Sequence, residues 1–389
     1  MRRKWLKGAL WVLLTPIILF VIVMILLYVP PVQNFIRKQA IAIASDATGM
    51  NISVERIDLR FPLNLLVRGV QVVQSENAAA DVQHPDTLLN LGSLNISVQA
   101  WPLLQGKVEV DNITLQEVAV NSSNLLEGMH IKGTLGRFFL ESHGIDLKRE
   151  NAVLNSVELS NTHMQVMLAD TTEAPKDTTE TVVNWKIALH DLKLKNVSVD
   201  LQMPLDSMAL AANIGDASIE DANADLKRQC YGWRKFALTG TTVNYDSGTA
   251  APIEGFDASH IALRDIRIGI DSVMACGRDM NAIIREFSMY DRSGLSVTSL
   301  TGRLFADSTV IRVPYLQLKT PHSNMDLTAQ TYWKLVDIPT TGHLSARFNA
   351  NIGKQDVLLF AGGLPETFKE AYPFRPLIIH AGTEGNLKQ

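Results

Sequence analysis

The chain has 389 residues, of which 46% are hydrophobic and 20% are charged, so general disorder is excluded and two or more domains or one extended array would fit. Its formal net charge is −4, yet Arg2, Arg3, Lys4 and Lys7 all precede the first apolar run. The rest of the chain therefore has a net charge of −8, four units more negative than the whole, which excludes a body built to bind nucleic acid.

The first predicted element is a membrane anchor at residues 9–29, ALWVLLTPIILFVIVMILLYV, which contains no charged residue. At about 1.5 Å per residue in a helix, this run is long enough to cross the hydrocarbon core of a bilayer. A secretory signal would be shorter and would end in small residues, whereas this run ends in Tyr28 and Val29 and is followed by Pro30. Because residues 1–8 are basic, we expect them to stay in the cytoplasm and the chain after the anchor to be exported. The anchor residues singled out are Leu10, Trp11, Pro16, Phe20 and Tyr28.

A short amphipathic helix is predicted for residues 30–49. Apolar residues recur at helical spacing from Val32 to Ala47, Pro31 suits the first turn and Gly49 suits the end of the helix. We expect this helix to cover the first edge of a sheet, because an uncovered edge strand recruits other chains.

From residue 50 to residue 389 strand patterns dominate, with a polar, Thr-rich loop predicted at 170–181 and a smaller loop at 75–86. The segments return at short intervals, as expected of successive antiparallel strands, and roughly 20 to 25 strands are predicted. Because compact open sheets rarely exceed about ten strands, the array is either several sandwiches or one long curled sheet. A short helix is predicted at 364–371, followed by a strand at 377–381. The other strands are expected near residues 65–73, 94–100, 107–120, 131–140, 155–168, 186–202, 236–245, 262–273, 295–305, 309–318, 325–334 and 342–350.

One spacing recurs in five of these segments, of which VEVDNITL at residues 108–115 is an example. Apolar residues fall at i, i+2, i+5 and i+7, so a step of three interrupts the alternation of a strand. One extra residue in a bulge or bend at that step would keep the apolar residues on one face, and the Asp or Asn found there in most of the segments suits such a bend. An ordinary half-buried antiparallel sheet produces a similar pattern. The other four segments are 52–59, 157–164, 192–199 and 261–268.

Motifs for catalysis are not found: the sequence has no Gly-rich phosphate loop, HExxH, GxSxG or Cys-x-x-Cys. His143 and Asp146 are the nearest approach to a ligand pair, and no third ligand is suggested. Cys230 and Cys276 are two separate thiols or one disulfide, which an exported domain would permit. We therefore predict no enzyme, no cofactor and no metal.

Three stretches resemble the AsmA-like superfamily, and most closely the N-terminal part of its TamB branch. They include an element "PLLQG" at 102–106, "YP" at Tyr372 and Pro373, and "GN" at Gly385 and Asn386. The stretches are ATGMNISVERIDLRFPLNLLVRGVQVV at 47–73, LNISVQAWPLLQGKVEVDNITLQEVAV at 94–120 and LPETFKEAYPFRPLIIHAGTEGNLKQ at 364–389.

The resemblance implies a mainly β protein: an elongated, taco-like antiparallel sheet with a hydrophobic groove, anchored in the bacterial inner membrane and extending into the periplasm. It further implies transport of phospholipids between membranes in outer-membrane biogenesis, and a partner barrel of the TamA or BamA type reached through a region absent here. A translocation and assembly scaffold for outer-membrane proteins is the alternative. TamB-like chains are longer, so we expect this one to be the N-terminal piece of a longer protein, or else a short member whose end a partner covers.

The residues predicted to line the groove are the apolar positions of the recurring strand segments. Plain core packing is the alternative for each of them. They are Ile96, Val98, Val108, Val110, Ile113, Leu115, Val157, Leu159, Leu192, Leu194, Val197, Val199, Ile261, Leu263, Ile266 and Ile268.

Overall fold

The computed structural model divides the chain into two compact units, one ending at Asn121 and one beginning at Ser122. The predicted anchor at 9–29, with its five singled-out residues, lies outside the described residues, as do Val108 and the loops at 75–86 and 170–181. Within the described part of the chain, no helix is both long and apolar enough to cross a membrane. The structure describes residues 30–60, 64–74, 87–99, 110–122, 128–146, 149–168, 184–338, 342–361, 365–371 and 373–386.

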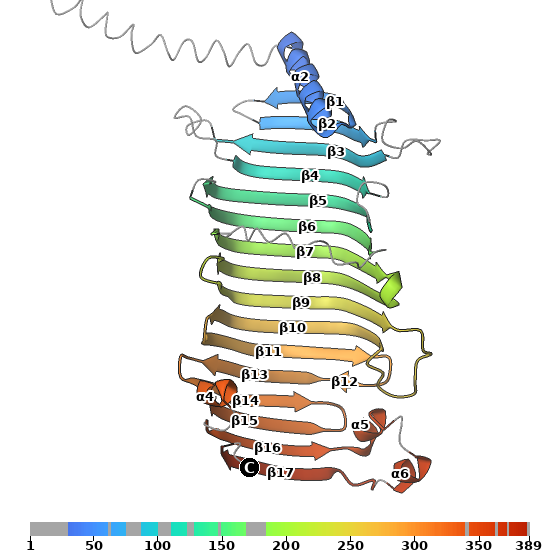
Figure 1. Cartoon of the computed structure of the whole chain (residues 1–389), viewed down its shortest axis with the longest axis vertical. Helices are drawn as coiled ribbons and strands as arrows, with labels where there is room; N and C mark the ends of the chain where they lie inside the picture. The colour runs from blue at the N-terminus through green and yellow to red at the C-terminus, as the bar shows by residue number, and fades with distance from the viewer. Residues whose placement is uncertain are drawn as a thin grey trace, which may run out of the picture. The chain divides into compact units, whose positions relative to one another are not determined.

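The first unit is an antiparallel ladder of four strands with one helix. The strands β1 (Asn51–Arg60), β2 (Asn64–Val73), β3 (Thr87–Val98) and β4 (Val110–Asn121) pair in chain order. Helix α2 (Pro30–Thr48), in the place where a helix is predicted, lies against β1 (Figure 1). The Gln33 amide donates to the carbonyl oxygen of Leu59 at 3.3 Å, and Arg37 donates to that of Glu55 at 2.7 Å. Side chains of α2 thus occupy main-chain acceptors of this edge strand.

The second unit is a longer ladder in which consecutive strands lie side by side (Figure 1). All its pairs are antiparallel except β6 with β7, which is parallel. Short helical segments η2 (Pro204–Asp206), α4 (Trp333–Asp337), α5 (Lys354–Leu359) and α6 (Glu366–Ala371) lie in its connections. Its strands are β5 (Met129–Asp146), β6 (Asn151–Leu168), β7 (Lys186–Met203), β8 (Met208–Asp225), β9 (Cys230–Ser247), β10 (His260–Cys276), β11 (Asp279–Asp291), β12 (Ser296–Val297), β13 (Ser299–Ala306), β14 (Val310–Lys319), β15 (Asn324–Tyr332), β16 (Leu344–Ile352) and β17 (Leu377–Gly385).

The mainly β class is confirmed, but three finer expectations need correction. The described residues hold 17 strands, fewer than predicted; β8 and β11 were not foreseen, and residues 333–334 begin a helix instead of ending a strand. The β6–β7 pair breaks the expected antiparallel order; parallel neighbours need a connection of about a dozen residues or more, and residues 169–185 supply that length. The taco-like curl is also wrong: the ladder is open and not strongly curled, because the described strands pair only with near neighbours.

In six neighbouring strands of the second unit, residues are left out of the cross-strand pairing at matching positions. We call this line of unpaired positions, or skipped rungs, the first seam, and it explains the recurring spacing. From β5 to β8 the pairing of neighbouring strands omits one residue from each strand, between β8 and β9 it omits two from each, and between β9 and β10 the register shifts. Asn161, Asn196 and Asp265 each have φ of 51°, the left-handed conformation that Asn and Asp tolerate. The amide of Asn196 also donates to Oδ1 of Asn161 at 3.0 Å. The seam runs through Gly136, Asn161, Asn196, Gly215, Gly240 and Asp265.

The predicted bend at the step of three is therefore confirmed in these strands. The remaining seam residues are glycines, and at Gly136 the backbones approach closely: a Cβ there would lie 2.8 Å from the Cβ of Asn161. In the first unit Asp111 is the extra residue of a bulge in β4, as expected. At the step in 52–59, Glu55 on β1 and Gly69 on β2 are left out of the pairing, and the glycine adopts the left-handed φ of 60°.

A second line of skipped rungs, the second seam, crosses β6 to β10 about six residues away along each strand. Asp221 and Ser272 have left-handed φ values of 51° and 53° on this line. The second seam was not predicted. It consists of Asn155, His190, Asp221, Arg234 and Ser272.

Candidate functional site

The two seams keep apolar and polar side chains on opposite faces of the second unit's sheet. Side chains alternate along a strand, and each seam resets the alternation by one residue. In β7 the reset leaves Lys193, Lys195, Ser198 and Asp200 on one face, which we call the polar face. The other, the apolar face, receives Ile187, Leu189, Leu192, Leu194, Val197, Val199 and Leu201.

Cross-strand pairing extends the apolar face over neighbouring strands, because directly paired residues project to the same side. Two rows lie between the seams and cross five or more strands without a charged residue. One row is Phe138, Leu159, Leu194, Ala217, Leu238 and Ile268. The other is Leu140, Val157, Leu192, Ile219, Phe236 and Ile270.

No second layer covers this face in the part of the chain that the structure describes. Its strands contact their ladder neighbours, and no described strand or helix packs across them. Met164 is 37% exposed and Val199 is 39% exposed, although both are large apolar residues. The described residues include no large side chain that is fully buried. A sheet with one uncovered apolar face is a surface suited to apolar ligands.

The predicted groove residues of the second unit all fall on the apolar face, but they are not equivalent. Val197 and Ile266 are only 6% and 5% exposed, because they follow the first seam, where side chains crowd. These two residues pack the bend, as the core-packing alternative proposed. The more accessible members are Val157, Leu159, Leu192, Leu194, Val199, Ile261, Leu263 and Ile268.

In the first unit the predicted residues also share one face of the ladder. Ile96 pairs with Ile113, and Val98 pairs with Val110, across β3 and β4. Leu115 faces Leu94 in the same ladder. Val108, the remaining member of the predicted set, lies outside the described residues.

Sequence reasoning missed the contributions of β5, β8 and β9, including Phe138, Ile219 and Phe236. It also missed the second seam, although the signal was present. IALHDLKL at 187–194 has apolar residues at i, i+2, i+5 and i+7, the same spacing that marks the first seam. This pattern shares Leu192 and Leu194 with the one at 192–199, and that overlap concealed the second step of three.

The polar face carries ion pairs beside the second seam. Nε of Arg234 lies 2.6 Å from Oδ2 of Asp221, and Nδ1 of His190 lies 2.6 Å from Oδ1 of the same carboxylate. Arg234 also pairs with Glu220. Hydrogen bonds from Arg234 and then His190 hold the pKa of the Asp221 carboxyl below its ordinary value. The polar face is thus a charged surface that favours contact with water.

A disulfide joins Cys230 and Cys276, which face each other at the start of β9 and the end of β10. It settles the open choice between two thiols and one bridge. His143 and Asp146 lie in β5, and no group of three metal-binding side chains gathers among the described residues.

Comparison of the chain with models of known protein families and with characterised proteins finds no match to either. The resemblance to the AsmA-like superfamily stays a prediction.

Proposed function

We propose that this chain is a bacterial inner-membrane-anchored protein of the periplasm that carries phospholipids between the inner and outer membranes in outer-membrane biogenesis. The acyl chains would lie on the apolar face of the sheet. The observation that carries this proposal is the uninterrupted pair of apolar rows between the seams, with no described layer over them.

The energy of hydration explains why such a face would suffice. Each CH₂ group exposed to water costs about 0.8 kcal/mol, so an acyl chain of about 16 carbons faces on the order of 13 kcal/mol in an aqueous gap. An apolar face that contacts one side of the chain removes a large part of that cost. Binding of this kind needs no catalytic residue.

Two further features support an exported location. The Cys230–Cys276 disulfide suits an oxidising compartment such as the periplasm. The basic segment 1–8 and the apolar run 9–29 have the charge order of an anchor with its N-terminus in the cytoplasm.

The direct test is photocrosslinking in cells with a light-activated amino acid at single positions. Leu194 lies on the apolar face, and the adjacent Lys195 lies on the polar face of the same strand. We expect phospholipid adducts, identified by mass spectrometry, from the Leu194 position and few or none from the Lys195 control. Equal adduct yields at both positions, or none at Leu194, would rule out the proposal.

A second candidate function is an assembly scaffold for outer-membrane proteins, favoured by the edge of β17. Among the described strands β17 pairs only with β16, and Ile378 on it is 65% exposed. An exposed edge of this kind accepts an added strand through main-chain hydrogen bonds. Crosslinks from Thr383 to outer-membrane protein precursors, with no lipid adduct at Leu194, would favour this alternative over the lipid carrier. A partner barrel of the TamA or BamA type belongs to either proposal.

A further inference from the structure

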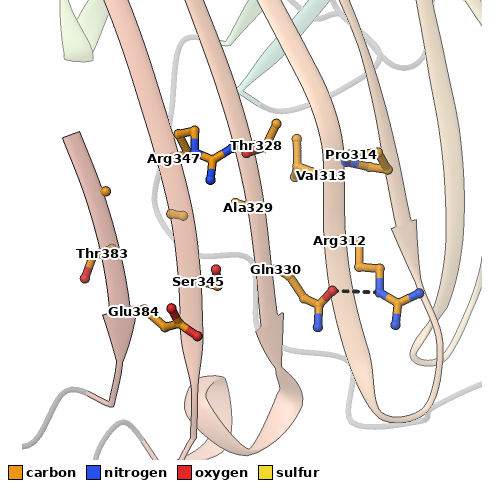
Figure 2. Close-up of a pocket in the computed structure, with 12 residues that line it drawn as sticks. Arg312, Val313, Pro314, Thr328, Ala329, Gln330, Ser345, Arg347, Thr383 and Glu384 are labelled. Atoms are coloured by element: carbon orange, nitrogen blue, oxygen red, sulfur yellow. Dashed lines mark hydrogen bonds between the residues drawn. The ribbon is translucent and has the colours of Figure 1, made fainter. Parts of the chain in front are cut away.

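A cavity of about 690 Å³ lies over β14 to β17 (Figure 2). The strand register from β10 to β16 puts its polar side chains on the side of the sheet opposite the apolar rows. The strand register explains its shape. Arg312 pairs with Gln330, Gln330 with Ser345, and Ser345 with Glu384, so long side chains stand at both ends of a row with a short serine between them.

A second row beside the first deepens the hollow. Thr328 pairs with Arg347, and Arg347 pairs with Gly382, which has no side chain. Short residues therefore make the floor, and Arg312, Arg347 and Glu384 make the walls (Figure 2). A β-bulge between Val313 and Leu316 places Pro314 and Tyr315 opposite Thr328, which interrupts the ladder there and bends β14.

The two arginines of the cavity differ in their contacts. Nε of Arg312 donates to Oε1 of Gln330 at 3.1 Å, which orients its guanidinium group. Arg347 is exposed, and its guanidinium group forms no hydrogen bond or ion pair with any residue that the structure describes. Its planar group of five donors remains available to a ligand, and the geometry of that group matches phosphate and carboxylate oxygens.

We propose that this cavity binds an oxyanion of the phosphate class, either free phosphate or a phosphate ester. Arg347 would form the main contact, Arg312 would contribute a second positive charge, and the hydroxyl groups of Ser345 and Thr328 would donate hydrogen bonds. The site is separate from the proposed lipid surface, because acyl chains would lie on the other face of the sheet.

The carboxylate of Glu384 supplies an opposing effect that makes the site testable in two directions. Glu384 is exposed, and Nε2 of the His343 imidazole lies 3.9 Å from its Oε1. Its negative charge on the cavity wall weakens the attraction of an anion. Removing that charge should therefore strengthen binding, whereas removing the charge of Arg347 should weaken it.

The experiment measures binding of inorganic phosphate to the full chain in a nonionic detergent by calorimetry at low ionic strength. We expect Arg347→Gln to weaken binding about tenfold, and Glu384→Gln to strengthen it severalfold. Arg267→Gln is the matched control, because Arg267 is an exposed arginine on the polar face of β10, outside the cavity. Unchanged affinity in Arg347→Gln, or the same loss in Arg267→Gln, would overturn the proposal.

Two further probes identify the source of the phosphate. Glycerol phosphate and dihexanoyl phosphatidic acid, a soluble short-chain lipid, are compared with inorganic phosphate in the same variants. Tighter binding of the lipid that depends on Arg347 would assign the site to a headgroup, and equal binding of all three would assign it to free phosphate. Failure of all three probes to bind would refute the site and would leave the crosslinking test at Leu194 unaffected.

Discussion

The two faces of the second unit's sheet are made by the same strands, yet they differ in almost every property. On β7 the apolar face carries Leu192 and Leu194, while the polar face carries Lys193 and Lys195 between them. No described strand or helix covers the apolar face, whereas the polar face carries the ion pairs. The difference teaches that stability and proposed function are separated by side-chain direction and not by position along the chain.

The seams are what maintain this separation over strands as long as 18 residues. Without a reset at Asn196, the alternation of β7 would place Val197 and Val199 among the polar side chains. Substitutions on the two faces, at the disulfide and at the first seam should therefore have different effects on lipid crosslinking and on stability.

The largest effect is expected from charges placed on the apolar face. Leu194→Asp combined with Ile219→Asp puts two carboxylates side by side in adjacent rows between the seams. Because an acyl chain cannot solvate a carboxylate, we expect phospholipid crosslinks at Leu238 to fall about tenfold or more. The matched control is Ser218→Asp with Thr239→Asp, which adds the same charge to the polar face. Equal losses in both double variants would mean that the faces are not functionally distinct.

Removal of the disulfide should affect stability without affecting the apolar face. Cys230 and Cys276 are 46 residues apart, and their bond closes a loop that limits the unfolded chain. We expect the double variant Cys230→Ser, Cys276→Ser to lose about 2–4 kcal/mol of unfolding free energy, measured by denaturant titration in detergent. Lipid crosslinking at Leu194 should persist at temperatures where this variant is folded. Its loss under those conditions would contradict the separation of stability from function.

A smaller effect is expected from the first seam itself. Asn196→Val puts a β-branched residue at φ 51° and removes the hydrogen bond to Asn161, so we expect a loss of about 1–2 kcal/mol. Asn196→Gly removes the same hydrogen bond but tolerates that φ, and it should retain most of the stability. Thermal unfolding of the pair measures the difference. If both variants were equally stable, the bend would not require a left-handed residue.

The smallest effect concerns acid stability of the polar face. The pKa of the Asp221 carboxyl is lowered in the folded chain by Arg234 and His190, so its contribution to stability is present above the ordinary value of about 4. That contribution is lost as the pH falls through the lowered pKa. We expect wild type to exceed Asp221→Asn slightly in melting temperature near neutral pH, and the difference to disappear on acidification. A difference that grew on acidification would reverse the sign of this argument.

Sequence patterns predicted the local geometry better than the arrangement in space. A step of three between apolar residues predicted a bend in the segments that contain Asn161, Asn196 and Asp265, because an apolar side chain on the wrong face is a local cost that appears in the spacing. The parallel pairing of β6 with β7 leaves no such trace, since the same side-chain pattern suits either direction. The arginine cavity was also missed: Arg312 and Arg347 are 35 residues apart, and only the register of β14 to β16 brings their rows together.

The constant separation of the two seams has a consequence for how such a sheet changes over evolutionary time. On β6 to β9 six residues separate the skipped rungs, as from His190 to Asn196 or from Asp221 back to Gly215. A one-residue insertion or deletion between them would turn part of one strand over and misalign it with both neighbours. Change in length is therefore expected to come as gain or loss of whole hairpins, which leaves the count between seams intact.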